Sequence, residues 1–191
     1  MTYYLYKLKF TTPVHFGADV TGVGLEKASM TCHADTLFSA LCHEIVLMHG
    51  AEELPKWIKA DFKVSDLMPY YEDTLYIPKP TLYFKNNNQK EDSEEDSSSH
   101  TKKKMKKITH IPVEKLGNYV SYLKGTSKID FEVPEFAQET VYPKVASSRS
   151  GEDGLPYYVS CYSFDDKAGL YFIVKLEESL NIDDFEQILK S

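Results

Sequence analysis

The chain has 191 residues, of which 42% are hydrophobic and 13% aromatic, so it can fold as one globular domain with its own core. No apolar run approaches the roughly 20 residues of a membrane span, and the first residues lack the basic region and cleavage site of a secretory signal. We therefore expect neither a secreted nor a membrane-spanning protein. The net charge of −7 argues at first against a nucleic-acid partner.

The negative charge is concentrated in two short segments. Residues 91–96 contribute −5 and residues 177–191 contribute −4, so the rest of the chain carries +2. The basic residues are uneven too, with 21 lysines and one arginine, Arg149. Its planar guanidinium suits phosphate or a base edge, although chance retention is the alternative. The net charge therefore does not exclude a polyanion partner.

The N-terminal third is predicted to form a strand, a long loop and a helix. Residues 3–10 end in an alternating pattern, with Tyr6, Leu8 and Phe10 on one face. Residues 11–32 contain one proline and three glycines, and loops of this length are usually functional or mobile. A helix follows and ends at Gly50. It begins near His33 or Asp35, and its apolar stripe consists of Leu37, Leu41, Ile45 and Met48.

The middle of the chain is predicted to interrupt a sheet. A short helix near 52–60 would have Pro55 in its first turn and would pack Trp57 and Ile58 inward. Two strands around a turn follow within 61–84. Residues 83–142 read as an insertion, with a disordered segment of opposite charge blocks at 85–107 and a short helix near 114–124.

The last part of the chain is predicted to contain a hairpin and the start of a helix. The two strands are 156–164 and 170–175, and the helix would be capped by Asn181 or Asp183. This order of elements predicts an α+β fold with an antiparallel sheet and helices on one face. A ferredoxin-like βαββαβ unit is the simplest such fold. Its last strand would be missing, which would leave an open sheet edge.

Metal binding finds little support in the sequence. The candidates are His15, His33, Asp35 and His43, and His33-Ala34-Asp35 resembles the H-x-D pairs of metal hydrolases. No second histidine pair, H-E-x-x-H motif or cysteine pair has ligand spacing. Residues 33 and 35 can equally cap the following helix. We therefore predict no metal site and no cofactor.

Catalytic motifs are also missing from the sequence. It contains no G-x-S-x-G or S-x-x-K motif. A general base acting on an RNA 2′-hydroxyl could be supplied by His15, and a structural role for this single histidine is the alternative. The cysteines form no C-x-x-C motif and are typical of small buried side chains in a reducing cytoplasm, where we expect the protein. They are Cys32, Cys42 and Cys161.

Two segments have the composition of a phosphate or RNA site. The loop at 11–32 provides glycines for close backbone approach, and the helix that follows it presents amides that favour an anion. Residues 144–151 combine a lysine, three serines and the single arginine. They precede a strand that carries Tyr157, Tyr158 and Tyr162. Hydroxyls, a guanidinium and aromatic rings are groups that bind single-stranded RNA. An exposed serine-rich turn is the alternative.

Several blocks of the sequence resemble RAMP-superfamily CRISPR proteins. The closest similarity is to the N-terminal part of the fourth-subunit family of type III-A (Csm) effector complexes. The most specific block is His33-Ala34-Asp35-Thr36-Leu37-Phe38-Ser39-Ala40-Leu41-Cys42. The other matching blocks are 15–17, 22–26, 143–149, 156–160 and 169–174. The resemblance covers nearly the whole chain outside 85–107, and the second ferredoxin-like half of the family would be absent.

The resemblance implies a ferredoxin-like (RRM-like) RAMP fold over 1–191 and a non-catalytic subunit that holds the 5′ handle of the crRNA. Such a subunit bridges the large polymerase-like subunit and the backbone RAMP subunit of the complex. A metal-independent endoribonuclease that uses His15 is the alternative. The insertion at 83–142 would match the family's β-hairpin thumb. The candidate RNA-binding residues are His15, Phe16, Gly17, Gly22, Gly24, Lys27, Ser29, His33, Thr36, Lys144, Ser147, Ser148 and Arg149.

Overall fold

A computed structural model describes residues 2–18, 24–82, 105–146 and 154–190. Four candidate RNA-binding residues lie outside these ranges: Gly22, Ser147, Ser148 and Arg149. Most of the segment that we expect to be disordered, 85–107, also lies outside them. Its last three residues, 105–107, are described and form a helical turn with Met105 buried.

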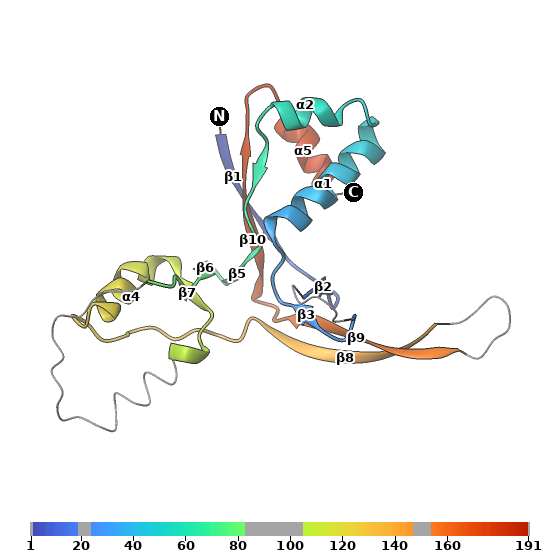
Figure 1. Ribbon diagram of the computed structural model, residues 1–191. Helices are drawn as coiled ribbons and strands as arrows, with labels where there is room; N and C mark the ends of the chain where they lie inside the picture. Colours follow the sequence, from blue (N-terminus) through green and yellow to red (C-terminus); the bar gives the residue numbers. More distant parts are fainter. Residues whose placement is uncertain (1, 19–23, 83–104, 147–153, 191) are drawn as a thin grey trace.

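The main sheet is antiparallel throughout (Figure 1). Its central strand β10 (Ala168–Leu176) pairs with β1 (Thr2–Leu8) on one side. On the other side β10 pairs first with β4 (Lys63–Val64) and then with β5 (Met68–Tyr71). The sheet continues from β5 to β6 (Thr74–Pro78) and β7 (His110–Pro112). These pairings confirm the predicted α+β class with an antiparallel sheet.

Three helices cover one face of this sheet: α1 (Ala34–His49), α2 (Leu54–Lys59) and α5 (Ile182–Lys190) (Figure 1). The core between the layers is built from alternate residues of β10 and from helix residues. Phe185 of α5 is completely buried, and its ring centroid lies 5.5 Å from that of Tyr6, 5.7 Å from that of Phe62 and 6.4 Å from that of Trp57. Burial of such a side chain contributes about 1.5–3 kcal/mol to stability, so α5 belongs to the core.

The helix ends agree with the sequence patterns in part. Gly50 terminates α1 with φ +92°, a conformation that suits glycine, as predicted. The start of α1, however, is capped by a residue that is distant in the sequence: the Ala34 amide donates to Oδ1 of Asp66 at 2.6 Å. Ile58 of α2 is 54% exposed, so the prediction that it packs inward is wrong, whereas its neighbour Trp57 is buried. Trp57 and Ile58 are adjacent in a helix with 3.6 residues per turn, so their side chains point in different directions and cannot both face the core.

Helix α5 is capped as the sequence predicts. The Asp183 amide donates to Oδ1 of Asn181 at 2.9 Å, and the Phe185 amide donates to the Asn181 carbonyl at 3.2 Å. The first turn also carries two carboxylates, Asp183 and Asp184, which favour the positive end of the helix dipole. Asn181 is therefore the helix cap.

A smaller lobe is attached to the far edge of the sheet. It consists of β7, a 3₁₀ turn (Val113–Lys115) and α4 (Leu116–Leu123), which confirms the short helix predicted near 114–124. Its own core contains Met105, Ile111 and Tyr119, and the Tyr119 hydroxyl donates to the Pro80 carbonyl at 3.2 Å. This lobe is stabilised by a satellite cluster separate from the main core.

The pH dependence of stability is expected to involve His110 in this lobe. Burial lowers the pKa of the His110 imidazole below its ordinary value of 6.5. The unfolded chain therefore binds the proton more readily. The stability that neutral His110 contributes is complete above pH 6.5 and is lost as the pH falls toward the lower pKa of the folded state. Urea unfolding at pH 7.5 and 5.5 should show a smaller loss for His110→Gln than for the wild type. His43→Gln, at an exposed histidine, should behave like the wild type.

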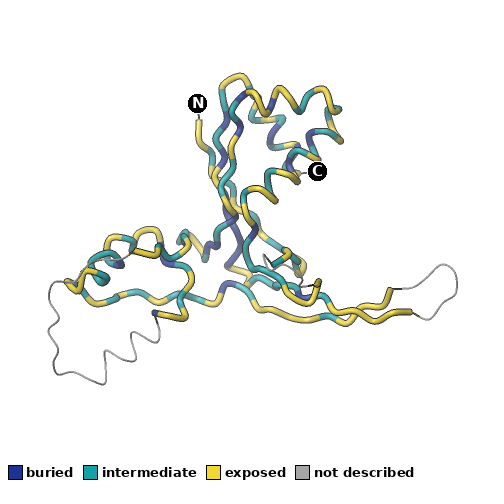
Figure 2. Tube along the Cα trace, viewed as in Figure 1, coloured by how far each residue is buried: buried dark blue, intermediate teal, exposed yellow. Residues whose placement is uncertain are grey.

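A long hairpin extends from the base of the sheet (Figure 1). Its strands are β8 (Ala137–Ala146) and β9 (Leu155–Phe164), paired in register from Ala137 opposite Phe164 to Ala146 opposite Leu155. The strand at 156–164 was predicted, but the prediction that it forms a hairpin with 170–175 is wrong: β9 pairs with β8, whereas β10 belongs to the main sheet. The hairpin therefore crosses residue 142, where we expected the insertion to end. Residues of β8 are mostly exposed on both faces (Figure 2), so they lack the alternation by which a strand is recognised.

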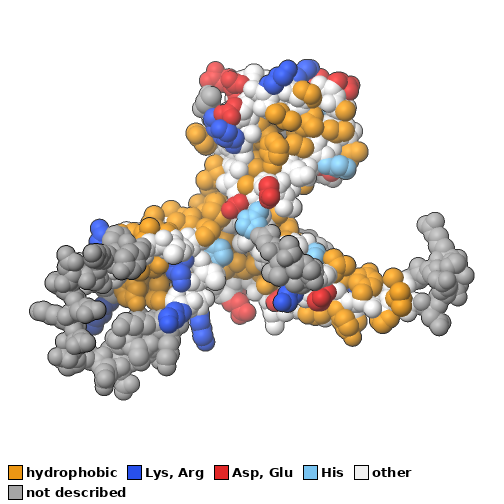
Figure 3. All heavy atoms as spheres, viewed as in Figure 1, with side chains coloured by type: hydrophobic (Ala, Val, Ile, Leu, Met, Phe, Trp, Pro, Cys, Tyr) orange, Lys and Arg blue, Asp and Glu red, His pale blue; other side chains and the backbone are white. Residues whose placement is uncertain are grey.

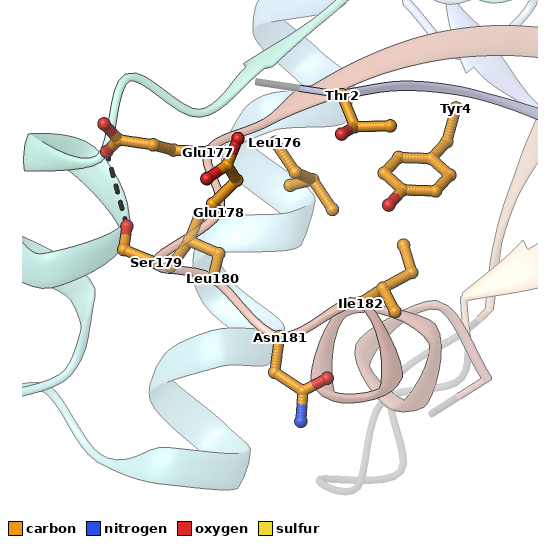
Figure 4. Close-up of a pocket in the computed structure, with 9 residues that line it drawn as sticks. All are labelled: Thr2, Tyr4, Leu176, Glu177, Glu178, Ser179, Leu180, Asn181 and Ile182. Atoms are coloured by element: carbon orange, nitrogen blue, oxygen red, sulfur yellow. Dashed lines mark hydrogen bonds between the residues drawn. The ribbon is translucent and has the colours of Figure 1, made fainter.

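The free edge of β1 borders a shallow pocket. Among the described residues β1 pairs with β10 alone. At the start of β1, Thr2 and Tyr4 face the segment that leads into α5 (Figure 4). The pocket is lined by Thr2, Tyr4, Leu176, Glu177, Glu178, Ser179, Leu180, Asn181 and Ile182. Its two carboxylates disfavour a phosphate, so the candidate RNA site must lie elsewhere.

Candidate nucleic-acid interface

The glycine-containing loop predicted from the sequence lies against the base of the hairpin. Two short strands, β2 (Phe16–Gly17) and β3 (Ala28–Ser29), pair with Phe16 opposite Ser29. Just before β2, Val14 exchanges two backbone hydrogen bonds with Tyr162 of β9, at 2.9 and 2.8 Å. The loop thereby covers the outer edge of β9 near the sheet. The loop therefore lies on the same strand whose outer part carries Tyr157 and Tyr158, whereas most of the segment predicted at 144–151 lies outside the described residues.

His15 attaches the loop to β9 through its side chain. Its Nδ1 lies 2.6 Å from the carbonyl oxygen of Ser160. A carbonyl can only accept, so Nδ1 carries the proton and donates it. The ring orientation is therefore set by a backbone group of the hairpin. This contact gives His15 the structural role that was the alternative to a general base, and a catalytic role for His15 remains a prediction.

Ser160 and Glu139 complete this contact and were not predicted. The Ser160 amide donates to the Leu25 carbonyl at 2.9 Å, and its hydroxyl donates to Oε1 of Glu139 at 2.5 Å. Burial, together with the nearby Glu139 carboxylate, raises the pKa of the Tyr162 hydroxyl. A serine and a glutamate on strands give no local sequence signal, because their importance depends on the loop that folds onto them.

The outer half of the hairpin exposes apolar and aromatic side chains to solvent (Figures 2 and 3). Leu155 is 74% exposed, Tyr158 59% and Tyr157 39%. Within 141–146 and 154–159 the charged side chain is that of Lys144, which is paired opposite Tyr157. Exposed apolar surface of this kind marks a binding site, and an isolated two-stranded hairpin is marginally stable in water. The outer hairpin is therefore suited to a partner.

The candidate residues nearest α1 have local partners. His33 is the residue before α1, and its Nδ1 lies 3.7 Å from Oδ1 of Asp66. The Thr36 amide donates to Oδ1 of Asp35 at 2.7 Å. Carboxylates of the chain itself thus already occupy the amides of Ala34 and Thr36, which we expected to favour an anion. His33 and Thr36 remain predictions as RNA contacts.

The other described candidates lie on the loop and on the hairpin. Gly24 accepts from the Lys27 amide at 3.5 Å in a turn, and Ser29 accepts from the Thr31 amide at 3.3 Å. A side chain added at Gly17 would meet open space, so that position leaves room for a ligand. Lys144 lies three residues beyond Val141, which is opposite Ser160, and so about 10 Å further along the hairpin.

The part of the chain that the structure describes contains neither a metal-binding cluster nor a membrane-spanning helix. Over these residues, three or more histidine, cysteine, aspartate or glutamate side chains do not gather into a group that could hold a metal ion. Of the helices described, none combines the length and the apolar character needed to cross a membrane. The three cysteines are free thiols, and burial raises the pKa of Cys32 and Cys42. Raised pKa values disfavour the thiolate, so these two residues have the properties of structural cysteines.

Comparison with known proteins reveals relatives in sequence. No protein-family model matches the chain. A protein of Mycobacterium tuberculosis (strain CDC 1551 / Oshkosh) described as CRISPR system Cms protein Csm4 is 29% identical over 166 residues, which are 86% of this chain and 51% of that protein. A protein of the same description from Thermococcus onnurineus is 28% identical over 146 residues, 73% of this chain and 48% of that one. The chain spans about half the length of these curated relatives.

Solved structures share the fold. A chain from the crystal structure of a Csm1–Csm4 cassette in complex with cA4 superposes with a TM-score of 0.63 at 19% identity, over 97% of this chain and 63% of that one. A chain from a Csm3–Csm4 subcomplex of a type III-A CRISPR–Cas interference complex gives 0.52 at 15% identity, over 100% of this chain and 62% of that one. The chain is therefore similar in sequence to proteins described as Csm4, and it shares the fold of chains from Csm1–Csm4 and Csm3–Csm4 complexes.

Proposed function

We propose that this chain acts as a non-catalytic RNA-binding subunit of a type III-A CRISPR effector complex in antiviral defence. In this role it holds the 5′ handle of the crRNA and bridges the large subunit to the backbone filament. The observation that carries the proposal is that the loop segments 13–18 and 24–29 are attached to β9, the strand whose outer part exposes aromatic and apolar side chains. The similarity to Csm4 proteins, which occur with Csm1 and with Csm3 in solved complexes, supports both the role and the two protein partners.

We also propose that the body follows the ferredoxin-like arrangement of strands and helices. In a βαββαβ unit, the first strand lies beside the third and the third beside the second. Strands β1, β10 and β4–β5 follow this spatial order, with α1 between the first and second and α5 after the third. The fourth strand of such a unit would pair with the edge of β1, which is free among the described residues.

The proposed mechanism combines backbone amides, cations and aromatic rings. The glycines of the loop allow the backbone to approach the handle phosphates closely, and lysine side chains provide charge. Tyr157 and Tyr158 offer exposed rings on which unpaired bases can stack. Lys144 provides the positive charge within residues 141–146 and 154–159 and is paired opposite Tyr157. The body with its charge of +2 thus binds RNA locally, despite the net −7 of the chain.

The test is crRNA retention by the complex assembled from this chain and its co-expressed large and backbone subunits. The wild type should retain handle-containing RNA, and Arg149→Ala should weaken retention by about 1–3 kcal/mol if the guanidinium binds phosphate or a base in a bidentate manner. Lys59→Ala, on the exposed side of α2, is the control and should leave retention unchanged. Equal retention by Arg149→Ala and the wild type would count against the assignment of this segment.

The same preparation tests the enzymatic alternative. Repeat RNA is incubated with the purified chain, with and without EDTA, and its length is followed on a gel. The non-catalytic proposal predicts intact RNA. Specific cleavage that persists in EDTA and disappears in His15→Ala would establish the endoribonuclease instead. Absence of RNA from an otherwise complete assembly would leave the role of a protein-interaction module.

A further inference from the structure

Ser160 joins three separate segments of the chain at one buried point. Its side chain is completely buried, and all of its polar groups are engaged. The amide bonds to Leu25 of the loop, the carbonyl accepts from His15 at the start of the loop, and the hydroxyl bonds to Glu139 of β8. One residue of β9 thus holds both ends of the loop and the opposite strand of the hairpin.

Glu139 holds this point from the other strand. It lies directly opposite Tyr162 in the β8–β9 register, and its carboxylate accepts from the hydroxyl of Ser160. Hydrogen bonds to a charged acceptor are stronger than those between neutral groups. The Ser160 hydroxyl is buried, so without this acceptor it would have no partner in the structure.

We propose that Glu139, through its bond to the buried Ser160 hydroxyl, is a positioning residue that fixes the loop segments 13–18 and 24–29 relative to the outer hairpin and thereby aligns the two parts of the RNA surface. This inference rests on the proposed function, because it concerns the same surface. Neither residue needs to touch RNA. Val14 provides two further backbone bonds to β9 on the sheet side of Ser160, and the β2–β3 pairing joins residues 28–29 to 16–17, whereas the turn at Leu25 is bonded to β9 through Ser160.

The charge of Glu139 makes a sharp test possible. If Glu139 acted on RNA through its charge alone, its removal would strengthen binding, because a carboxylate repels phosphates. The positioning role predicts the opposite, since Glu139→Ala removes the acceptor of Ser160 and loosens the loop. We expect RNA affinity of the assembled complex to fall by about 5- to 30-fold in Glu139→Ala. Glu139→Gln keeps an acceptor oxygen and should bind at least as tightly as the wild type.

The matched control is Gln138→Ala, the preceding exposed residue of β8, which should leave affinity unchanged. A second readout needs no RNA. Hydrogen–deuterium exchange of the full chain should become faster at 13–17 and 24–29 in Glu139→Ala, where the buried Ser160 hydroxyl has lost its acceptor. Exchange at 13–17 and 24–29 should stay unchanged in Glu139→Gln. Exchange in α1 should stay unchanged in every variant.

The outcomes separate this inference from the proposed function. Unchanged exchange in Glu139→Ala, or an affinity that rises in that variant, overturns the positioning role while RNA binding by the wild type stands. Faster exchange together with lower affinity supports it. A wild-type complex that retains no RNA overturns the proposed function, and the positioning role for RNA is overturned with it.

Discussion

Phe185→Ala is expected to lower the free energy of unfolding by about 3–5 kcal/mol, the usual cost of removing a buried aromatic ring. The ring is completely buried and lies against Tyr6, Phe62 and Trp57, which come from β1, the segment before β4, and α2. Its loss leaves a cavity where the two layers meet. Urea unfolding followed by tryptophan fluorescence measures the change, because Trp57 is the one tryptophan of the chain and is part of this cluster.

Two further variants of α5 are controls for this prediction. Gln187→Ala, at an exposed position of the same helix, should change stability by no more than about 0.5 kcal/mol. Phe185→Leu, which keeps most of the apolar volume, should cost less than Phe185→Ala. A loss below about 1 kcal/mol in Phe185→Ala would show that α5 is not an integral part of the core.

Tyr157→Ala is expected to weaken RNA binding by about 1–3 kcal/mol, or roughly 5- to 150-fold, if a base stacks on this ring. Neighbouring residues of a strand point to opposite faces of a hairpin. Tyr157 shares its face with Lys144, directly opposite in the register, whereas Tyr158 is opposite Pro143. A cation beside a ring favours a nucleotide, so the loss should be larger for Tyr157→Ala than for Tyr158→Ala.

The controls for this prediction separate stacking from folding. Tyr157→Phe keeps the ring and should retain wild-type affinity. Tyr157 is 39% exposed, so its replacement should leave the unfolding midpoint nearly unchanged. Affinity is measured on the assembled complex at several salt concentrations, because Lys144→Ala should reduce the salt dependence whereas Tyr157→Ala should not. Equal losses for both tyrosines would indicate that the hairpin contacts RNA through both faces.

The sequence predicted the separate segments of the candidate site, but it did not predict how these segments contact one another. The glycine loop and the segment at 144–149 were each recognisable by composition, and the resemblance to RAMP proteins joined them to one function. The sequence did not show that the loop lies on β9, nor that His15 bonds the Ser160 carbonyl. It also did not reveal Asp66 as the acceptor at the start of α1, because Asp66 follows 32 residues later. Hydrogen bonds between distant segments leave no periodic trace.

The sequence by itself determined the body of the protein. Strand β1 and helix α1 bury one face against the main core, so their apolar residues recur with the period of the element, whereas β10 is buried almost throughout and stands out as a continuous apolar run; the positions of all three were predicted correctly. The tertiary structure alone decided the extent of the hairpin and the junction at Ser160. Strand β8 is exposed on both faces and has no apolar period, and Ser160 is buried because the loop covers it. Periodic burial produces a recognisable apolar pattern in the local sequence, whereas contacts between distant segments form only once the chain has folded.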